Sequence, residues 1–302
     1  MVTINDLSKN LVNNSNIIFI NIIIDFINDF INTFNILSKE EILNRINRLE
    51  YIGISKNQYK VFDADATFGS GIYFYIALNS KYENYPQDTI KSSIYHELIH
   101  CVSSYYENNE LKEGLCLDVN NGTLFDEIMT DYYAQLLLFK RNIYNYRRDI
   151  IANNETYQEY IDSYRIGYNI FSSLGKTYDF IFHNDLLEAK FVNSKRFIDK
   201  FNILIKELDI NSFDYNSFIN EKDYHKRLFN ISEIFVKYLI NFYEKNNIKR
   251  TEIIYDQKIN CFINMLSKEQ HNSIIVPNQQ LTFYIYNELY KFIYKEDKLF
   301  IR

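Results

Sequence analysis

Two histidines and a glutamate form the sequence motif with the clearest chemical meaning. The segment 96–100 reads HELIH, an HExxH pattern, and its surroundings predict a helix over about 88–106. Side chains four residues apart on a helix project from one face, so His96 and His100 can bind the same metal ion. Glu97 lies beside them, where its carboxylate can accept a proton from a metal-bound water. The pattern therefore predicts a zinc site with two imidazole ligands and Glu97 as the general base.

A later acidic segment can complete this site. A catalytic zinc ion takes three protein ligands and leaves one position for water. Glu127 and Asp131 are four residues apart on a helix predicted over about 124–140, again on one face. We expect Glu127 to be the third ligand and Asp131 to accept a hydrogen bond from a ligand imidazole, which fixes the ring tautomer. Asp126 points to another part of this helix and is the less favoured ligand.

The two segments together resemble the gluzincins, the thermolysin-like superfamily of zinc metallopeptidases. Their pattern is HExxH on one helix and a glutamate on a later helix, followed four residues on by an aspartate. The match covers about 36 residues, from His96 to Asp131. The run that begins at Glu127 also looks like the second motif of uncharacterised metallopeptidase-like proteins of low-GC bacteria. The resemblance implies that His96, His100 and Glu127 bind zinc, with Glu97 as the base and Asp131 holding an imidazole.

The same resemblance implies a fold and a reaction. The expected fold is a zincin-like core, with a small sheet and the HExxH helix, and the reaction is zinc-dependent hydrolysis of a peptide or protein substrate. The segment Gly69–Phe74 lacks the Met-Glu-Asn by which the aminopeptidase branch holds an amino terminus, which favours an endopeptidase. An edge strand at 72–76 would bind the substrate backbone by strand addition.

One catalytic role stays open in the sequence. A donor should stabilise the tetrahedral oxyanion, and relatives use a tyrosine or histidine downstream of the metal site. The candidates are His183, Tyr164, Tyr168 and Arg165, and the sequence does not choose among them. This gap motivates an alternative: a non-catalytic helical interaction protein with a degenerate zincin core. The intact Glu97 argues against it, because a purely structural metal site has no use for a base.

The elements that must position these residues are mostly helices. The chain has only 7 Gly and 2 Pro, fewer than a turn-rich sheet protein needs. Helices are predicted over about 15–34 and 39–50, the second with a Ser38–Glu41 capping box. Aromatic and β-branched residues between 51 and 82 predict strands. The expected fold class is therefore α+β, mainly α.

The second half of the chain is predicted to be helical throughout. Apolar residues recur there at three- and four-residue spacing, in stripes typical of buried helix faces. The stripes lie within 157–171, 228–242 and 281–293. An Asn-rich stretch around 144–156 is the best candidate boundary. It divides a zincin-like metal-binding domain with N-terminal helices (1–150) from a helical C-terminal subdomain (151–302).

Composition narrows the partners and the compartment. The 302-residue chain carries a net charge of −6, which argues against nucleic acid as a partner. Its three cysteines contain no CxxC pair, which favours a reducing, cytoplasmic location. The apolar segment 17–34 includes Asp25 and Asp29, which argue against a membrane span and for a buried helix. The sequence gives no indication of the oligomeric state.

Overall fold

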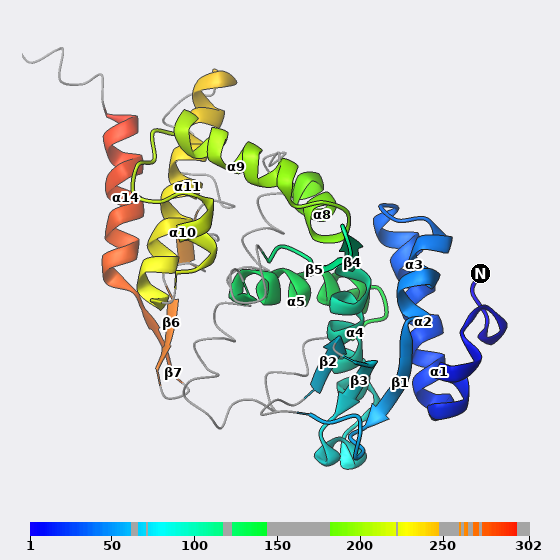
Figure 1. Cartoon of the computed structure of the whole chain (residues 1–302). Helices are drawn as coiled ribbons and strands as arrows, with labels where there is room; N and C mark the ends of the chain where they lie inside the picture. The colour runs from blue at the N-terminus through cyan, green and yellow to red at the C-terminus, as the bar shows by residue number, and fades with distance from the viewer. Residues whose placement is uncertain are drawn as a thin grey trace, which may run out of the picture.

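The protein is mainly helical with small sheets, which confirms the predicted class at this level (Figure 1). The computed structural model describes residues 1–61, 66–70, 72–116, 123–143, 182–221, 223–247, 260, 263–264, 268–271 and 274–294.

Helices form the N-terminal part of the chain. They are the 3-10 turn η1 (Ile4–Asp6) and the helices α1 (Lys9–Asn14), α2 (Ile17–Phe34) and α3 (Lys39–Ile46). The predicted capping box begins α3: Ser38 N donates to Glu41 Oε2 at 2.8 Å, and Glu41 N donates to Ser38 Oγ at 3.2 Å. The predicted helix over 39–50 is too long, because residues from Leu49 onward pair into a strand instead.

The main sheet follows. It has the strand order β1 (Leu49–Ile54), β3 (Phe74–Leu78), β2 (Ala66–Ser70). β3 pairs in parallel with β1 and antiparallel with β2, so the predicted edge strand at 72–76 is wrong and β2 is at the edge. Gly69 lies in β2 opposite Tyr75. The Tyr75 ring lies so close that a Cβ at position 69 would be 2.3 Å from Tyr75 Cε1.

The HExxH motif lies on the central helix of the fold, α4 (Gln87–Ser103), which follows the short η2 (Ser80–Asn84). β2 and β3 contact it, as do α2, α3, α5 and α8, so α4 is buried on nearly all sides. Three of its apolar residues, Ile94, Leu98 and Cys101, are fully buried. A helix surrounded in this way holds its side chains in one geometry.

A hairpin ends α4 three residues earlier than predicted. It consists of β4 (Ser104–Glu107) and β5 (Glu110–Glu113), joined by Asn108 and Asn109 with φ of 52° and 65°. Two arginines, Arg45 in α3 and Arg48 just after it, donate hydrogen bonds to carbonyls in the last turn of α4. Arg45 Nη1 donates to Val102 O at 2.5 Å, and Arg48 Nη2 donates to Cys101 O at 3.0 Å. These bonds fix the C-terminal end of α4 at the turn that carries His100.

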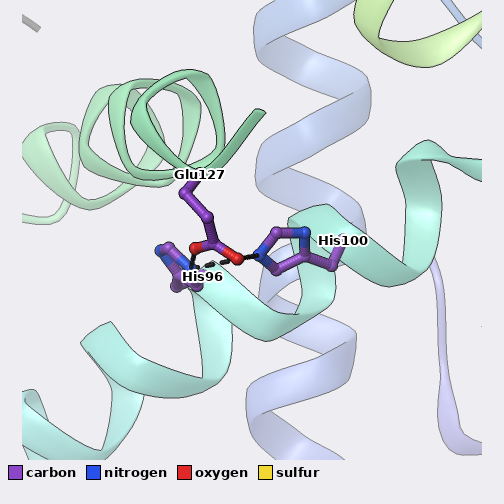
Figure 2. A group of neighbouring side chains, drawn as sticks. All are labelled: His96, His100 and Glu127. Atoms are coloured by element: carbon purple, nitrogen blue, oxygen red, sulfur yellow. Dashed lines mark hydrogen bonds and ion pairs between the residues drawn. The ribbon is translucent and has the colours of Figure 1, made fainter. Parts of the chain in front are cut away.

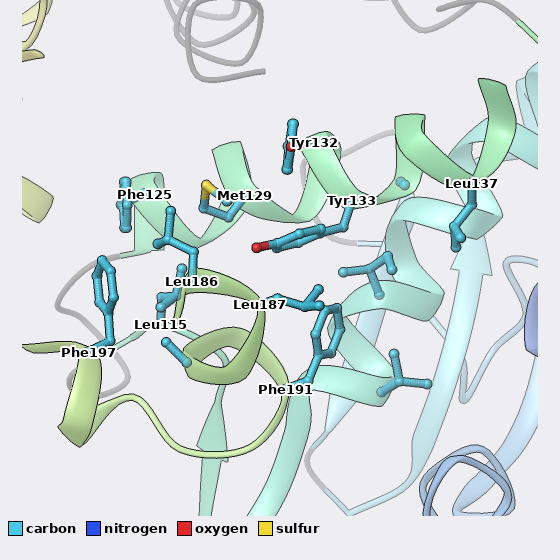
Figure 3. Packing of buried hydrophobic residues seen from close by; sticks show 14 of the residues in the cluster. Leu115, Phe125, Met129, Tyr132, Tyr133, Leu137, Leu186, Leu187, Phe191 and Phe197 are labelled. Carbon is cyan, nitrogen blue, oxygen red and sulfur yellow. The ribbon is translucent and has the colours of Figure 1, made fainter. Parts of the chain in front are cut away.

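Two further helices complete the core around α4: α5 (Thr123–Phe139) and α8 (Phe182–Phe191). Figure 3 shows their buried side chains interleaved. The Phe191 ring lies 5.0 Å from that of Phe30 on α2 and 5.4 Å from that of Tyr133 on α5. α8 therefore packs on the N-terminal helices, although the sequence placed it in the C-terminal subdomain. The predicted boundary around 144–156 lies outside the described residues, and the division into domains stays a prediction.

The rest of the chain forms a second group of helices and a hairpin. These are α9 (Lys195–Glu207), α10 (Tyr215–Ile219), α11 (Tyr224–Lys245), β6 (Lys268–His271), β7 (Ile274–Pro277) and α14 (Gln279–Ile293). The predicted stripes on α11 and α14 are confirmed as buried faces, with Phe235 and Ile285 fully buried. The stripe in 157–171 lies outside the described residues. The β6–β7 hairpin contradicts the all-helical prediction, because the β-branched run Ile274–Val276 favours a strand.

α2 is, among the described residues, the one helix long and apolar enough to cross a membrane by length and composition. A third of its residues (33%) are buried inside the protein. Core helices of soluble proteins can be equally long and apolar. Both carboxylates of α2 are paired with side chains of α4. Lys91 Nζ lies 2.6 Å from Asp25 Oδ2, and Tyr95 Oη donates to Asp29 Oδ2 at 2.7 Å.

Candidate metal centre

Three nitrogen and oxygen donors meet where α5 crosses α4 (Figure 2). His96 and His100 project from the same face of α4, and Glu127 reaches across from α5 between their rings. The Nε2 atoms of His96 and His100 are 3.2 Å apart. Glu127 Oε2 lies 3.0 Å from His96 Nε2, and Glu127 Oε1 lies 3.2 Å from His100 Nε2. The structure thus brings the three predicted ligands together.

These separations fit a zinc ion. Zinc binds imidazole nitrogen and carboxylate oxygen at about 2.0–2.2 Å in tetrahedral geometry, which places neighbouring donors about 3.3 Å apart. The observed 3.0–3.2 Å is close to that spacing. Two imidazoles and one carboxylate are also the donor set of a catalytic zinc site, with the fourth position left for water. The residues present therefore fit the metal that the motif predicts.

A carboxylate faces the outer nitrogen of each imidazole. Asp131 Oδ1 is 3.6 Å from His96 Nδ1, so the carboxylate lies beside the expected imidazole, at a distance too long for the predicted hydrogen bond. Asp126 Oδ2 is 3.5 Å from His100 Nδ1. Such partners orient the ring so that Nε2 points at the metal. Sequence reasoning placed Asp126 away from the site and so missed its position behind His100.

The electrostatics of the site favour positive charge at its centre. Burial acts to lower the pKa of His100, but the charge of Glu127 and the bond to Asp126 outweigh it and raise the pKa to about 10. Burial acts to raise the pKa of Glu127, yet the two imidazoles hold it well below its usual value. The ligand carboxylate is therefore ionised at neutral pH, and the imidazoles lie in a field that attracts a proton or a metal cation.

A buried lysine holds Asp126 in place. Lys190, on α8, is fully buried, and its Nζ lies 2.7 Å from Asp126 Oδ1 and 2.6 Å from Thr130 Oγ1. Leu115 N donates to the same Asp126 oxygen at 2.7 Å. Burial alone would raise the pKa of Asp126, but the Lys190 charge lowers it. Sequence reasoning missed Lys190, although its spacing of three and four residues from Leu187 and Leu186 places it on their helix face, which is an available signal.

Gly114 makes room for this arrangement. Its φ is +51°, and a Cβ there would lie 2.2 Å from Asp126 Oδ1 and 2.8 Å from Lys190 Nζ. Any side chain at this position would displace the Asp126 carboxylate, so a glycine is required.

The predicted base is buried and has no paired group among the residues that the structure describes. Glu97 is 5% exposed, and its carboxylate makes no hydrogen bond or ion pair within the part of the chain that the structure describes. Buried carboxylates are normally paired, so this one is suited to bind a water or a substrate group. Solvent reaches the neighbouring donors, because the side chains of Glu127 and His100 are 21% and 16% exposed.

The oxyanion candidates stay predictions. Tyr164, Arg165 and Tyr168 lie outside the described residues. His183 belongs to the first turn of α8, and the position of its side chain is not among those described.

Comparisons with known proteins leave the site to be interpreted from its own geometry. No family model, no curated protein and no solved structure matches the chain.

Proposed function

We propose that the protein is a zinc-dependent metallopeptidase, acting as an endopeptidase on a peptide or protein substrate. The observation that carries this proposal is the convergence of three side chains: His96 Nε2 and His100 Nε2 are 3.2 Å apart, and the two oxygens of Glu127 lie 3.0 Å and 3.2 Å from them, one on each. A zinc ion bound there supplies a water of pKa about 7 and polarises the scissile carbonyl.

The chain's own residues supply the proton transfer. Glu97, adjacent to a ligand on α4 and without a protein partner in the described ranges, accepts the proton of the attacking water. It then donates that proton to the leaving amine. Asp131 and Asp126 keep the two imidazoles oriented while the substrate binds.

The gluzincin-like core is part of the same proposal. The motif helix α4 contacts β2, which is one of the two edge strands of the main sheet. Among the described residues β2 has a sheet neighbour on one side only, so its other side can pair with an extended substrate. β2 therefore replaces the segment 72–76 as the strand proposed to bind the substrate backbone.

We further propose that the protein works in the cytoplasm, with no membrane span and no nucleic-acid partner. The support is the pairing of the α2 carboxylates with Lys91 and Tyr95, which suits a core helix, and the net charge of −6.

Two variants test the proposal. In His96→Ala, purified protein should lose its zinc, measured by elemental mass spectrometry, together with cleavage of a peptide library. In Glu97→Gln, zinc should stay at one equivalent while cleavage falls at least a thousandfold, because only the base is removed. His225→Ala, which removes an exposed histidine of α11, is the matched control and should change neither.

The outcomes separate the hypotheses. If zinc content and proteolysis are the same in the parent and in both site variants, the assignment is wrong. If zinc depends on His96 but neither the parent nor Glu97→Gln cleaves any peptide, the non-catalytic interaction protein replaces the peptidase.

A further inference from the structure

We propose that Lys190 is a positioning residue of the metal centre: its ammonium group holds the Asp126 carboxylate against the outer nitrogen of His100. This inference rests on the proposed zinc site, and it concerns a residue that touches no ligand atom of that site.

The contacts of Asp126 divide between its two oxygens. Oδ1 lies 2.7 Å from Lys190 Nζ and 2.7 Å from Leu115 N, while Oδ2 lies 3.5 Å from His100 Nδ1. With Oδ1 held by two donors, the carboxylate has one orientation, and in it Oδ2 faces the imidazole. The same two bonds keep Asp126 from turning towards the metal as a fourth ligand, which would close the position that water needs.

The burial of Lys190 shows that the pair acts as a unit. The lysine side chain is 0% exposed and that of Asp126 is 3% exposed. A buried ammonium is costly unless it is paired and hydrogen-bonded, and here Asp126 and Thr130 provide both. A surface lysine could not impose this geometry, because solvent would screen the pair and leave both side chains mobile.

The helix that carries Lys190 is itself anchored. Phe191, the next residue, packs on Phe30 and Tyr133, and its carbonyl accepts a hydrogen bond from Arg45 Nη1 at 2.7 Å. Arg45 also binds the end of α4 at Val102, so one guanidinium joins the helices of His100 and Lys190. The metal centre therefore depends on a residue beyond the predicted domain boundary.

The test measures zinc affinity in the full chain by competition with a chelator of known affinity. Lys190→Met, which keeps length and removes charge, should bind one zinc ion about 10–100-fold more weakly than the parent, the usual effect of losing a group that supports a ligand. Lys200→Met is the matched control. It breaks a 2.5 Å ion pair between Lys200 on α9 and Asp185 on α8, the helix that also carries Lys190. Its zinc affinity should equal that of the parent, even where its melting temperature falls.

A double-mutant cycle keeps the test decisive if Lys190→Met folds poorly. The double variant Asp126→Asn/Lys190→Met removes both buried charges together, which proteins tolerate better than removing one. If Lys190 acts through Asp126, the double variant should bind zinc as Asp126→Asn does, within about threefold. The inference would be overturned if Lys190→Met weakened zinc binding by the same factor in the parent and in Asp126→Asn. It would also be overturned if Lys190→Met bound zinc as tightly as the parent.

The failure of this inference is distinct from that of the proposed function. If the parent protein binds zinc no better than His96→Ala does, both the proposed metal centre and this inference are wrong. If the parent binds zinc through His96 and Lys190→Met binds it equally well, only the role of the lysine is wrong.

Discussion

Helix α4 has ionic groups on two sides, and their partners differ. Towards α2, Asp25 and Asp29 each have at least one partner with fixed positive charge. Arg141 donates to Asp29 through Nε and, at 3.0 Å, through Nη2, and its Nη1 lies 3.2 Å from Asp25. Lys91 lies 2.6 Å from Asp25. Each carboxylate there meets a group that is a cation at any physiological pH, so the cluster needs nothing more.

Towards α5, the carboxylates face imidazoles, whose charge depends on what they bind. Glu127 touches both rings on the Nε2 side, and Asp126 and Asp131 face the Nδ1 atoms. Here a carboxylate lies between two imidazoles, whereas on the α2 side the Arg141 guanidinium lies between two carboxylates. The contrast shows how one helix can carry an ion-pair network that ties it to its neighbour and a centre arranged for a metal cation.

The largest effect separating the two sides is expected at Gly114. Gly114→Ala should destabilise the protein by about 3 kcal/mol and weaken zinc binding at least tenfold, because the new Cβ displaces Asp126 from His100. Urea unfolding and chelator competition measure the two quantities. Asn109→Ala, at φ of 65° in the β4–β5 turn, is the control for backbone strain alone and should leave zinc affinity unchanged. Equal zinc affinity in Gly114→Ala and the parent would contradict the expected clash between the new Cβ and the Asp126 carboxylate.

A smaller effect, on stability alone, is expected on the α2 side. Arg141→Met leaves Asp29 without its main cation and should cost about 2 kcal/mol in urea unfolding. Zinc affinity should stay within threefold of the parent. Arg196→Met, which breaks an exposed pair with Glu188, should cost less than about 0.5 kcal/mol. If Arg141→Met weakened zinc binding as Gly114→Ala does, the two sides of α4 would not be independent.

The smallest effect is expected at the start of α3, remote from both clusters. Ser38→Ala removes the capping box and should cost about 1 kcal/mol. Because Arg45, which binds the end of α4, lies at the opposite end of α3 from Ser38, the metal affinity should not change. Thermal melts with and without zinc measure this, and a zinc-dependent shift smaller than that of the parent would show that general destabilisation also weakens the site.

Local patterns were enough to predict much of the site and the helices. The spacing of His96 and His100, and of Glu127 and Asp131, places each pair on one helix face, because the helix repeat is a property of the backbone. The buried faces of α11 and α14 follow from the same periodicity, and the Ser38 cap follows from the Ser-x-x-Glu pattern at a helix start. The edge position of β2 did not follow, since strand order depends on which segments pair and not on their composition.

Sequence periodicity thus established which side chains share a face, and chain packing established which faces meet. No local signal relates Lys190 to Asp126, 64 residues earlier, or turns Asp126 towards His100. These contacts arise because α8 docks against α2, α4 and α5, and a docking geometry is the joint result of many apolar contacts between distant segments. Helix geometry is set within a few residues of the chain, whereas a pair of buried charges is set by the whole core that excludes water from it.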